Sequence, residues 1–493
     1  VQTSYVKKTI SDASYSSDRV AVMTYFAKGD AAGRTNVLET HRIYDGSVQA
    51  PDLVRESKVS ALTTDDKSVA TIEMKLNATD YSVTDLEYDT YGNVTKVTGA
   101  ENSIGQRAYT IYGYDTDVHQ YIENITNQFG ESICNIYDKA TGQLQQTVGI
   151  GGQAMAYEYD SFDRLENVWA PREINISGSA PTISYSYDLS GTVAKATTTH
   201  NLGNTSNTAV NNVAKSCVLV DLTSRPAITS GVSTVTFVDG TAKAIQLQTE
   251  QSVISGGTSN TNSFIVSGVQ TLDKFGRGTQ QYADIAGPST GTFGTFYIHD
   301  DYVNNDLIQQ NVTYDYNNRL LSQETWSGED GSSTGQWTTT AMEYDWNTDL
   351  GGSDYMYYEK TWVKSSTGSG TTTPDVESAT YTDSRGRKVG QITYGATSSD
   401  NIITGFTYNN IGELMSVTDP IGLVTNYTYD LAGRVLTEDH PDRGLTETFY
   451  DKASNVTFLR TPGTIPFGGG ITMNYQYNRL SSKRMPGSSG SDL

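Results

Sequence analysis

Apolar and polar residues alternate over many short stretches of this chain. In Tyr185-Ser186-Tyr187 and Tyr427-Thr428-Tyr429, every second residue is aromatic. A period of two places alternate side chains on the same face of a β-strand. The pattern therefore predicts short strands, separated by turns rich in Gly, Asn and Asp.

The dipeptide Tyr-Asp ends many of these stretches. It occurs ten times in the sequence, whereas random placement of the same residues predicts roughly 2.5 occurrences. From Asp89 to Asp188, the aspartates of successive Tyr-Asp dipeptides are 26, 23, 22 and 28 residues apart. Near the C-terminal end, Asn409, Asp430 and Asp451 are spaced 21 residues apart. A fixed period of this length indicates one supersecondary unit copied many times.

The residues after the dipeptide are also regular, with the pattern Tyr-Asp-x-x-Gly-Arg/Asn-apolar. The aspartate can accept hydrogen bonds from backbone N–H groups two residues on, and glycine adopts the positive φ that such a turn requires. Each repeat is thus predicted to be a strand, a tight turn and a returning strand. Because one hairpin is unstable in water, we expect the hairpins to stack on their neighbours. The turn residues predicted in this way are Tyr88, Asp89, Gly92, Tyr114, Asp115, Tyr137, Asp138, Tyr159, Asp160, Tyr187, Asp188, Asp273, Gly276, Arg277, Tyr429, Asp430, Gly433, Arg434, Tyr450 and Asp451.

The spacing of the repeats divides the chain into four segments. Residues 1–80 form a β region with degenerate repeats, 81–190 a first block of Tyr-Asp repeats, 191–310 degenerate β repeats, and 311–493 a second block. Another repeat begins at Tyr475. We therefore expect the second block to continue beyond the last residue, and the chain to be an interior fragment.

Composition narrows the class of protein further. Tyr accounts for 33 of the 493 residues, only 18% are charged, and the net charge is −22. A coiled coil needs Leu-rich heptads, and a disordered chain lacks aromatic residues. Nucleic-acid binding needs a basic face, and a membrane span needs about 18 consecutive apolar residues, which this sequence lacks. A large, Tyr-rich, all-β protein without a nucleic-acid partner remains.

A search for metal and catalytic motifs yields little. The two cysteines, Cys134 and Cys217, have no zinc-site spacing, and the sequence does not decide whether they pair. The segment 345–349 begins like an EF-hand loop, but Leu350 replaces the required glycine and Met356 the bidentate glutamate, so we expect a loop without an ion. The segment 331–335 fits Gly-x-Ser-x-Gly, yet it lies in a Ser/Gly-rich stretch without the flanking strand and helix. We interpret the five scattered histidines as structural: His41, His119, His200, His299 and His440.

The repeats resemble the YD repeats of RHS proteins. The stretch 406–451 is similar to consecutive repeats of that family, and 236–246 and 266–277 resemble segments typical of the B components of insecticidal toxin complexes. The likeness covers most of residues 80–480, although Ala242-Lys243 replaces the usual Gly-Arg. It implies a long β-sheet ribbon that spirals into a hollow shell.

In that family the shell encloses a C-terminal toxic domain until delivery. The resemblance therefore implies a structural, non-enzymatic protein without cofactor or metal, secreted or at the bacterial cell surface. Its partners would be the enclosed toxin domain of the same polypeptide, and secretion-machinery or immunity proteins.

Two alternatives can be tied to particular residues. A third, a glycoside hydrolase on a β-scaffold, would need two positioned carboxylates, and the sequence gives no reason to choose any of its 56 acidic residues. Family shells can end in an aspartyl autoprotease, and Asp419-Pro420-Ile421-Gly422 carries part of its motif. Because Asp419 lies at the position of an ordinary inter-repeat turn, we expect a turn there. The second alternative is a carbohydrate-binding adhesin, in which exposed tryptophans stack on sugars. Aromatic side chains in stacked hairpins more often form ladders between strands. The tryptophans concerned are Trp169, Trp326, Trp337, Trp346 and Trp362.

Overall fold

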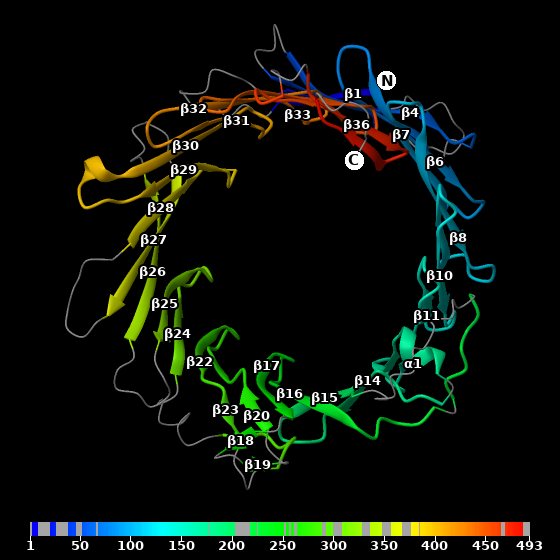
Figure 1. Cartoon of the computed structure of the whole chain (residues 1–493), viewed down its shortest axis with the longest axis vertical. Coiled ribbons are helices and arrows are strands. Elements are labelled where there is room, and N and C mark those ends of the chain that lie inside the picture. Colours follow the sequence, from blue (N-terminus) through cyan, green and yellow to red (C-terminus); the bar gives the residue numbers. More distant parts are fainter. Residues whose placement is uncertain are drawn as a thin grey trace. The chain divides into compact units, whose positions relative to one another are not determined.

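The structure is a computed structural model of the 493-residue chain (Figure 1). The residues it describes are 2–7, 20–25, 38–45, 52–65, 68–176, 178–202, 217–223, 225–250, 253–255, 258–260, 264–287, 292–298, 308–327, 336–347, 356–366, 376–383, 385–464 and 469–486.

By their contacts, the residues form two compact units. The first unit comprises Val1–Glu131, Asp345–Tyr358 and Ala379–Leu493, and the second comprises Ser132–Tyr344 and Glu359–Ser378. The division of the sequence into four repeat segments is a separate matter and stays a prediction.

The first unit consists of hairpins from both ends of the sequence. A short 3-10 helix, η1 (Ser398–Asp400), interrupts them. The strands are β1 (Gln2–Lys7), β2 (Val20–Tyr25), β3 (Leu38–Asp45), β4 (Asp52–Leu62), β5 (Val69–Lys75), β6 (Tyr81–Tyr88), β7 (Val94–Glu101), β8 (Arg107–Tyr114), β9 (Ile122–Asn127), β29 (Lys388–Thr393), β30 (Ile402–Tyr408), β31 (Leu414–Thr418), β32 (Val424–Tyr429), β33 (Val435–His440), β34 (Gly444–Tyr450), β35 (Val456–Arg460), β36 (Ile471–Gln476) and β37 (Arg479–Arg484).

The second unit contains the middle of the sequence. Among the described residues its one α-helix is α1 (Pro171–Asn175). Its strands are β10 (Ser132–Tyr137), β11 (Leu144–Val148), β12 (Ala154–Tyr159), β13 (Leu165–Trp169), β14 (Ile183–Asp188), β15 (Ala194–Asn201), β16 (Gly231–Val238), β17 (Ala244–Glu250), β18 (Val253–Ser255), β19 (Thr258–Asn260), β20 (Phe264–Ser267), β21 (Gln270–Leu272), β22 (Gly278–Tyr282), β23 (Ile285–Ala286), β24 (Ile308–Tyr314) and β25 (Leu320–Ser327). Strands β26 (Gln336–Asn347), β27 (Met356–Ser366) and β28 (Val376–Thr382) contribute residues to both units.

Strands that follow one another in sequence pair antiparallel, as the hairpin pattern predicts. In β32 and β33, Asn426 lies opposite Asp439, and the register shifts between Thr428 and Tyr429. Similar shifts occur at Tyr88 and at the tyrosines of other Tyr-Asp pairs. A β-bulge of this kind re-aims a side chain, so it changes the direction of the tyrosine just before each turn.

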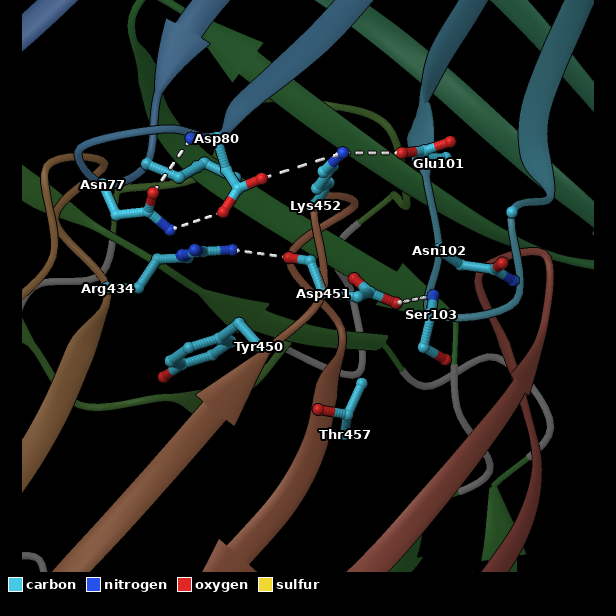
Figure 2. Close-up of a pocket in the computed structure, with 12 residues that line it drawn as sticks. Asn77, Asp80, Glu101, Asn102, Ser103, Arg434, Tyr450, Asp451, Lys452 and Thr457 are labelled. Carbon is cyan, nitrogen blue, oxygen red and sulfur yellow. Dashed lines mark hydrogen bonds and ion pairs between the residues drawn. The ribbon is translucent and has the colours of Figure 1, made fainter.

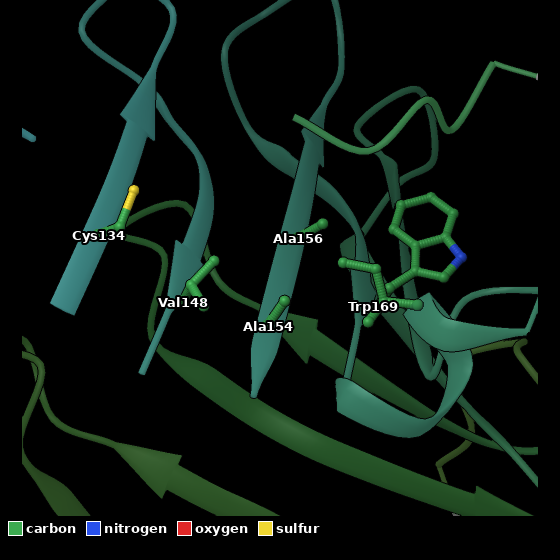
Figure 3. Close-up of a cluster of buried hydrophobic side chains, with 6 residues drawn as sticks. Cys134, Val148, Ala154, Ala156 and Trp169 are labelled. Carbon is green, nitrogen blue, oxygen red and sulfur yellow. The ribbon is translucent and has the colours of Figure 1, made fainter. Parts of the chain in front are cut away.

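Fully buried apolar side chains are few among the described residues. One cluster lies in the first unit and contains Ala379, Tyr381 and Ile392. A larger cluster in the second unit brings together side chains from successive strands and α1 (Figure 3). Most strand residues are half-buried, which indicates sheets whose faces are only partly covered. The prediction of an all-β protein with long antiparallel sheets is confirmed.

Candidate functional site: the repeat turns and the seam of the first unit

In the Tyr-Asp turns that the structure describes, the aspartate closes the turn. Oδ1 of Asp430 accepts hydrogen bonds from the backbone N–H groups of Ala432, at 2.9 Å, and Arg434, at 3.0 Å. The N–H of Gly433 donates to the carbonyl of Asp430, and Gly433 has φ of +86°. This is an Asx-type turn in which the third residue after the aspartate needs the left-handed region. Asp89, Asp160 and Asp273 accept the same pair of backbone hydrogen bonds.

Other predicted turn residues show variants of this geometry. Asp115 accepts four backbone N–H groups, whereas the side chains of Asp138 and Asp188 each accept one, from Ala140 and Ser190. Burial would raise the pKa of Asp115, but its backbone hydrogen bonds outweigh that effect and hold the pKa well below its usual range. The predicted turn glycines that follow Asp89 and Asp273, Gly92 and Gly276, both have positive φ.

In many of the described repeats, the tyrosine of the motif links the repeat to the one before it. The hydroxyl of Tyr450 donates to the carbonyl of Val435, at 3.0 Å, which is the first residue of the preceding returning strand. Burial raises the pKa of Tyr450 further above neutral pH. Comparable bonds join Tyr88 to Val69, Tyr114 to Val94, Tyr159 to Leu144, Tyr187 to Leu165, Tyr429 to Leu414 and Tyr475 to Val456.

The arginine of the motif links each repeat to the one after it. Arg434 Nε donates to Asp430 Oδ2 at 2.6 Å, while Nη1 donates to the carbonyl of Asp451 at 2.8 Å. Its guanidinium also lies over the ring of Tyr450, 4.7 Å from the centroid, a cation–π contact. Arg277 reaches Asp315 and Tyr314 in the same manner. A repeat that carries both residues, such as the one with Tyr429 and Arg434, is therefore connected to its neighbours in both directions.

The pair formed by the turn aspartate and the residue four positions on follows a charge rule. Asp383 faces Arg387, whereas Asn409 donates through Nδ2 to Glu413. Asn127 and Glu131 repeat the second arrangement. When the first turn residue is an aspartate that accepts, the residue four positions on is a donor such as arginine. When the first residue is an asparagine that donates, the residue four positions on is an acceptor such as glutamate.

Within the first unit, turns from the two ends of the sequence lie against one another. We call this contact the seam: turns within residues 76–131, with Arg55 on β4, meet turns within residues 409–479. At one end, Leu431 N–H donates to the carbonyl of Leu76 at 3.1 Å. Arg55 donates to the carbonyl of Asp430 and forms an ion pair with Glu413.

The middle of the seam is ionic (Figure 2). Lys452 Nζ lies 2.7 Å from Glu101 Oε1 and 3.9 Å from Asp80 Oδ1. Asp451 Oδ2 accepts a hydrogen bond from the N–H of Ser103, at 3.1 Å. A polar cavity of about 450 Å³ adjoins these groups.

The far end of the seam adds aromatic contacts. Asn102 Nδ2 donates to the carbonyl of Tyr477 at 2.9 Å, and the Tyr477 ring meets Phe129 edge-on, with centroids 5.4 Å apart. Arg479 forms an ion pair with Glu131 and lies over the Phe129 ring. The Arg479 hydrogen bond lowers the pKa of the Glu131 carboxyl. The seam thus joins segments about 350 residues apart in sequence, mainly through polar groups.

Three other candidates from the sequence, Asp419, His440 and residues 345–347, lie in turns or in a strand. Asp419 Oδ1 accepts the N–H groups of Ile421 and Leu423, so it closes an inter-repeat turn, as expected. His440 Nδ1 accepts the N–H of Asp442 in another turn. Strand β26 includes residues 345–347, so the expectation of a loop there is wrong for these three residues, because the alternating strand pattern continues through them.

Two of the remaining sequence candidates, the segment 331–335 and His299, lie outside the described residues. Where the structure is described, no group of three His, Cys, Asp or Glu side chains could hold a metal ion. No helix in the described ranges is long and apolar enough to cross a membrane. The ladder expected for the tryptophans occurs at Trp326 and Trp337, which face each other across β25 and β26 with ring centroids 5.4 Å apart.

Hairpins that are capped by Asp and joined by Tyr and Arg define a β-repeat protein. The family model described as RHS Repeat matches residues 408–445. The chain therefore contains an RHS repeat, and the predicted resemblance to RHS-repeat proteins is confirmed. No curated protein matches the chain.

Solved structures of toxin-complex proteins match almost the whole chain. TcdB2-TccC3 matches with a TM-score of 0.65 at 12% identity, over 97% of this chain and 28% of that chain. The Photorhabdus luminescens Tc holotoxin pore matches with a TM-score of 0.65 at 12% identity, over 97% of this chain and 29% of that chain. TcdB2-TccC3 without its hypervariable C-terminal region matches with a TM-score of 0.62 at 13% identity, over 97% of this chain and 30% of that chain. At these identities the likeness concerns the fold, which is that of the Tc toxin RHS shell, and the chain spans less than a third of each matched chain.

Proposed function

We propose that the chain forms part of a shell that encloses and shields a C-terminal toxin or effector domain of the same polypeptide. The shell would be secreted or displayed at the bacterial surface. Its further partners would be secretion-machinery or immunity proteins. The chain itself would act as a wall, without catalysis.

The observation that carries this proposal is the seam. A wall made of hairpins needs contacts along the ribbon and also between ribbon segments far apart in sequence. Tyr450 and Arg434 supply the first kind, and Lys452 and Arg479 the second. Polar links of this type close a surface without requiring a thick apolar core, in keeping with the few fully buried side chains described.

The fold match supports an enclosing role. One matched structure is TcdB2-TccC3 without its hypervariable C-terminal region, so that relative has a variable segment at its C-terminus. A shell that holds interchangeable cargo must be independent of the cargo sequence. Backbone hydrogen bonds and repeated turns, which dominate this chain, meet that requirement.

A protease-protection assay on the full polypeptide that contains this chain tests the proposal. The domain that follows the repeats should resist a protease in the native protein and become cleavable after Lys452→Glu. That substitution places a carboxylate against Glu101 and Asp80 and so opens the seam. Arg443→Glu is the matched control, because it also places a carboxylate beside a glutamate, Glu438, at an exposed turn that makes none of the contacts described for the seam.

Two outcomes would contradict the proposal. One is a downstream domain that is digested equally fast in the native protein and in the Lys452→Glu variant. The other is an electron-microscopy envelope of the full polypeptide that shows a solid rod. Glycan binding by the intact protein would favour the adhesin alternative instead.

A further inference from the structure

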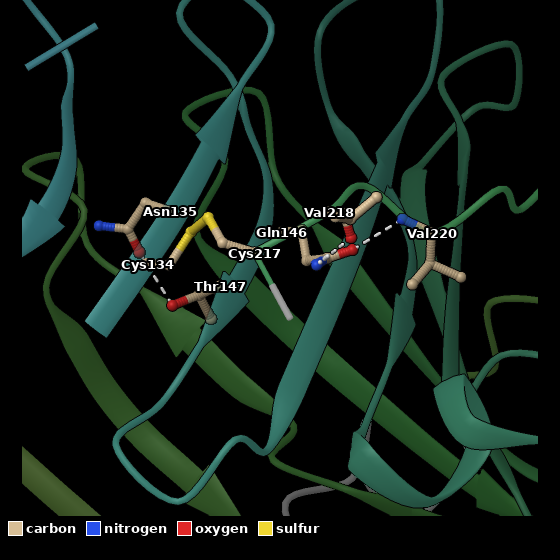
Figure 4. Close-up of a disulfide and its surroundings, with 7 residues drawn as sticks. All are labelled: Cys134, Asn135, Gln146, Thr147, Cys217, Val218 and Val220. Carbon is tan, nitrogen blue, oxygen red and sulfur yellow. Dashed lines mark hydrogen bonds between the residues drawn. A yellow bond between two sulfur atoms is a disulfide. The ribbon is translucent and has the colours of Figure 1, made fainter. Parts of the chain in front are cut away.

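The second unit contains a covalently fastened segment that belongs to no strand. The described residues 217–223, together with Arg225, run past β10–β13, and we call them the strap (Figure 4). Cys217 at its start is bonded to Cys134 on β10, with their Cα atoms 5.9 Å apart. Cys134 is buried, but Cys217 is exposed, so a reductant can reach the bond.

A buried glutamine holds the middle of the strap. The side chain of Gln146 on β11 is fully buried. Its Nε2 donates to the carbonyl of Val218, and its Oε1 accepts the N–H of Val220, both at 2.9 Å. The carboxamide thus pairs with the strap backbone as a neighbouring strand would. If the strap leaves, water must replace both bonds.

The strap also covers the larger apolar cluster. Val220 and Leu222 pack against the group that contains Ala154, Ala156 and Trp169. Figure 3 shows the side chains of that group. Trp169 is 1% exposed and both alanines are 0% exposed. Alanines this small leave the sheet face flat, so the strap supplies the side chains that keep water out.

A second strap in the same unit provides an internal comparison. Residues 292–298 are held by two buried glutamines: Gln248 bonds Gly294 and Thr295, and Gln246 bonds both polar groups of the Tyr297 backbone. Two phenylalanines of this segment meet Phe237 and Phe264 edge-on. The second strap therefore has twice as many glutamine contacts and aromatic packing, with no disulfide. The first strap has one glutamine and the disulfide, whereas the second has two glutamines on the same strand, β17.

We propose that the Cys134–Cys217 bond makes the first strap a redox-controlled cover of the Trp169 cluster. A dithiol reductant supplies two electrons and two protons, becomes a cyclic disulfide, and leaves Cys134 and Cys217 as thiols. The freed end of the strap then exchanges between a docked and an undocked state. In the undocked state the apolar face around Trp169 and the Gln146 carboxamide are open to a partner or to solvent.

The redox state of the Cys134–Cys217 bond, and with it the position of the strap, would depend on the compartment in which the protein resides. Disulfides persist outside cells and are reduced in the cytosol. In a secreted shell the cover would be fastened before delivery and released inside a reducing target cell. This consequence rests on the proposed function, whereas the switch itself does not.

Hydrogen–deuterium exchange on the chain with and without dithiothreitol tests the switch. Reduction, verified by titration of two thiols, should raise deuterium uptake several-fold in peptides that cover 217–223 and 144–148. Acrylamide quenching of tryptophan fluorescence should increase in parallel. Uptake in 292–298 should not change, and reoxidation should restore the original pattern.

Cys217→Ser is the matched variant, because it changes an exposed side chain and leaves buried Cys134 in place. It should show the high uptake without dithiothreitol and no further response to it. Unchanged uptake in 217–223 after complete reduction would overturn the proposal, and so would an equal rise in both straps, which would mean general unfolding. The experiment does not involve a cargo domain, so its outcome is independent of protease protection.

Discussion

The charge rule of the turns makes a quantitative prediction at Asp383 and Arg387. Arg387 donates through Nε to Asp383 Oδ2 at 2.6 Å, and both side chains are about four-fifths buried. At the equivalent positions, Asn409 and Glu413 form the reversed pair. The double substitution Asp383→Asn/Arg387→Glu should therefore rebuild a natural turn of this protein, although each single substitution breaks one.

The expected free energies follow from the hydrogen bonds and charge pairs that each substitution removes. Asp383→Asn turns an ionic acceptor into an amide that faces a guanidinium, and should cost about 1.5 kcal/mol. Arg387→Glu also removes the bond to the Asn409 carbonyl, at 3.0 Å, and brings two carboxylates together, for about 3 kcal/mol. The double variant regains the side-chain pair and should cost only about 2 kcal/mol. The coupling energy is then about −2.5 kcal/mol, well outside the scatter for independent sites.

The assay is a double-mutant cycle. Chemical denaturation at pH 7 gives the stability of the four proteins, and amide exchange at 385–387 localises the change to the turn. Arg387→Gln serves as the control, because it lacks the repulsion and should be less destabilising than Arg387→Glu. A coupling energy near zero would refute the charge rule and show that the backbone alone determines these turns.

Three further predictions follow from single contacts. Tyr450→Phe should lower the stability by about 1 kcal/mol, since the Val435 carbonyl loses its donor, and chemical denaturation should show a larger effect than for Phe at Tyr427, a half-buried tyrosine on β32. Gly433→Ala should cost at least about 1 kcal/mol, because φ is +86° and a Cβ there would clash with Arg55, whereas Gly240→Ala, with open space around it, should be nearly neutral in the same measurement. Lastly, the pKa of Glu131 is lowered by Arg479, so their ion pair stabilises the seam above the unfolded pKa, about 4.3, and that contribution should disappear as pH falls through the lower folded value. The protection of amides 127–131, measured as the intrinsic exchange rate at each pH divided by the observed rate, should therefore fall only below about pH 4. Arg479→Gln should make this loss smaller and leave the part that depends on the Asn127 hydrogen bond.

The local part of the fold could be predicted because its cause lies within five residues. Asp430 and Gly433 build their turn with the backbone next to them, so their spacing alone reveals it. The fold class, the hairpin period and the RHS resemblance follow from the repetition of this one local unit. The aspartates of these turns also account for part of the acidity.

The hydrogen-bond acceptors of the motif tyrosine and arginine could not be predicted from the sequence. Their recurrence at fixed positions was visible, but the Val435 and Asp451 carbonyls are backbone groups and leave no mark on the residue pattern. The strap glutamines are a similar case, since Gln146 looks like any polar strand residue until burial and the strap backbone are known.

The sequence by itself determined what a hairpin does with its nearest neighbours, because those interactions depend on residue type and a spacing of a few positions. Only the tertiary structure decided the seam, in which Lys452 meets Glu101 across 351 residues, and the pairing of Cys134 with Cys217 across 83. In a repeat protein many turns present equivalent charges and carbonyls, so sequence does not select which two turns meet. That selection is visible only in contacts of the folded chain, such as Lys452 with Glu101 and Asn102 with Tyr477.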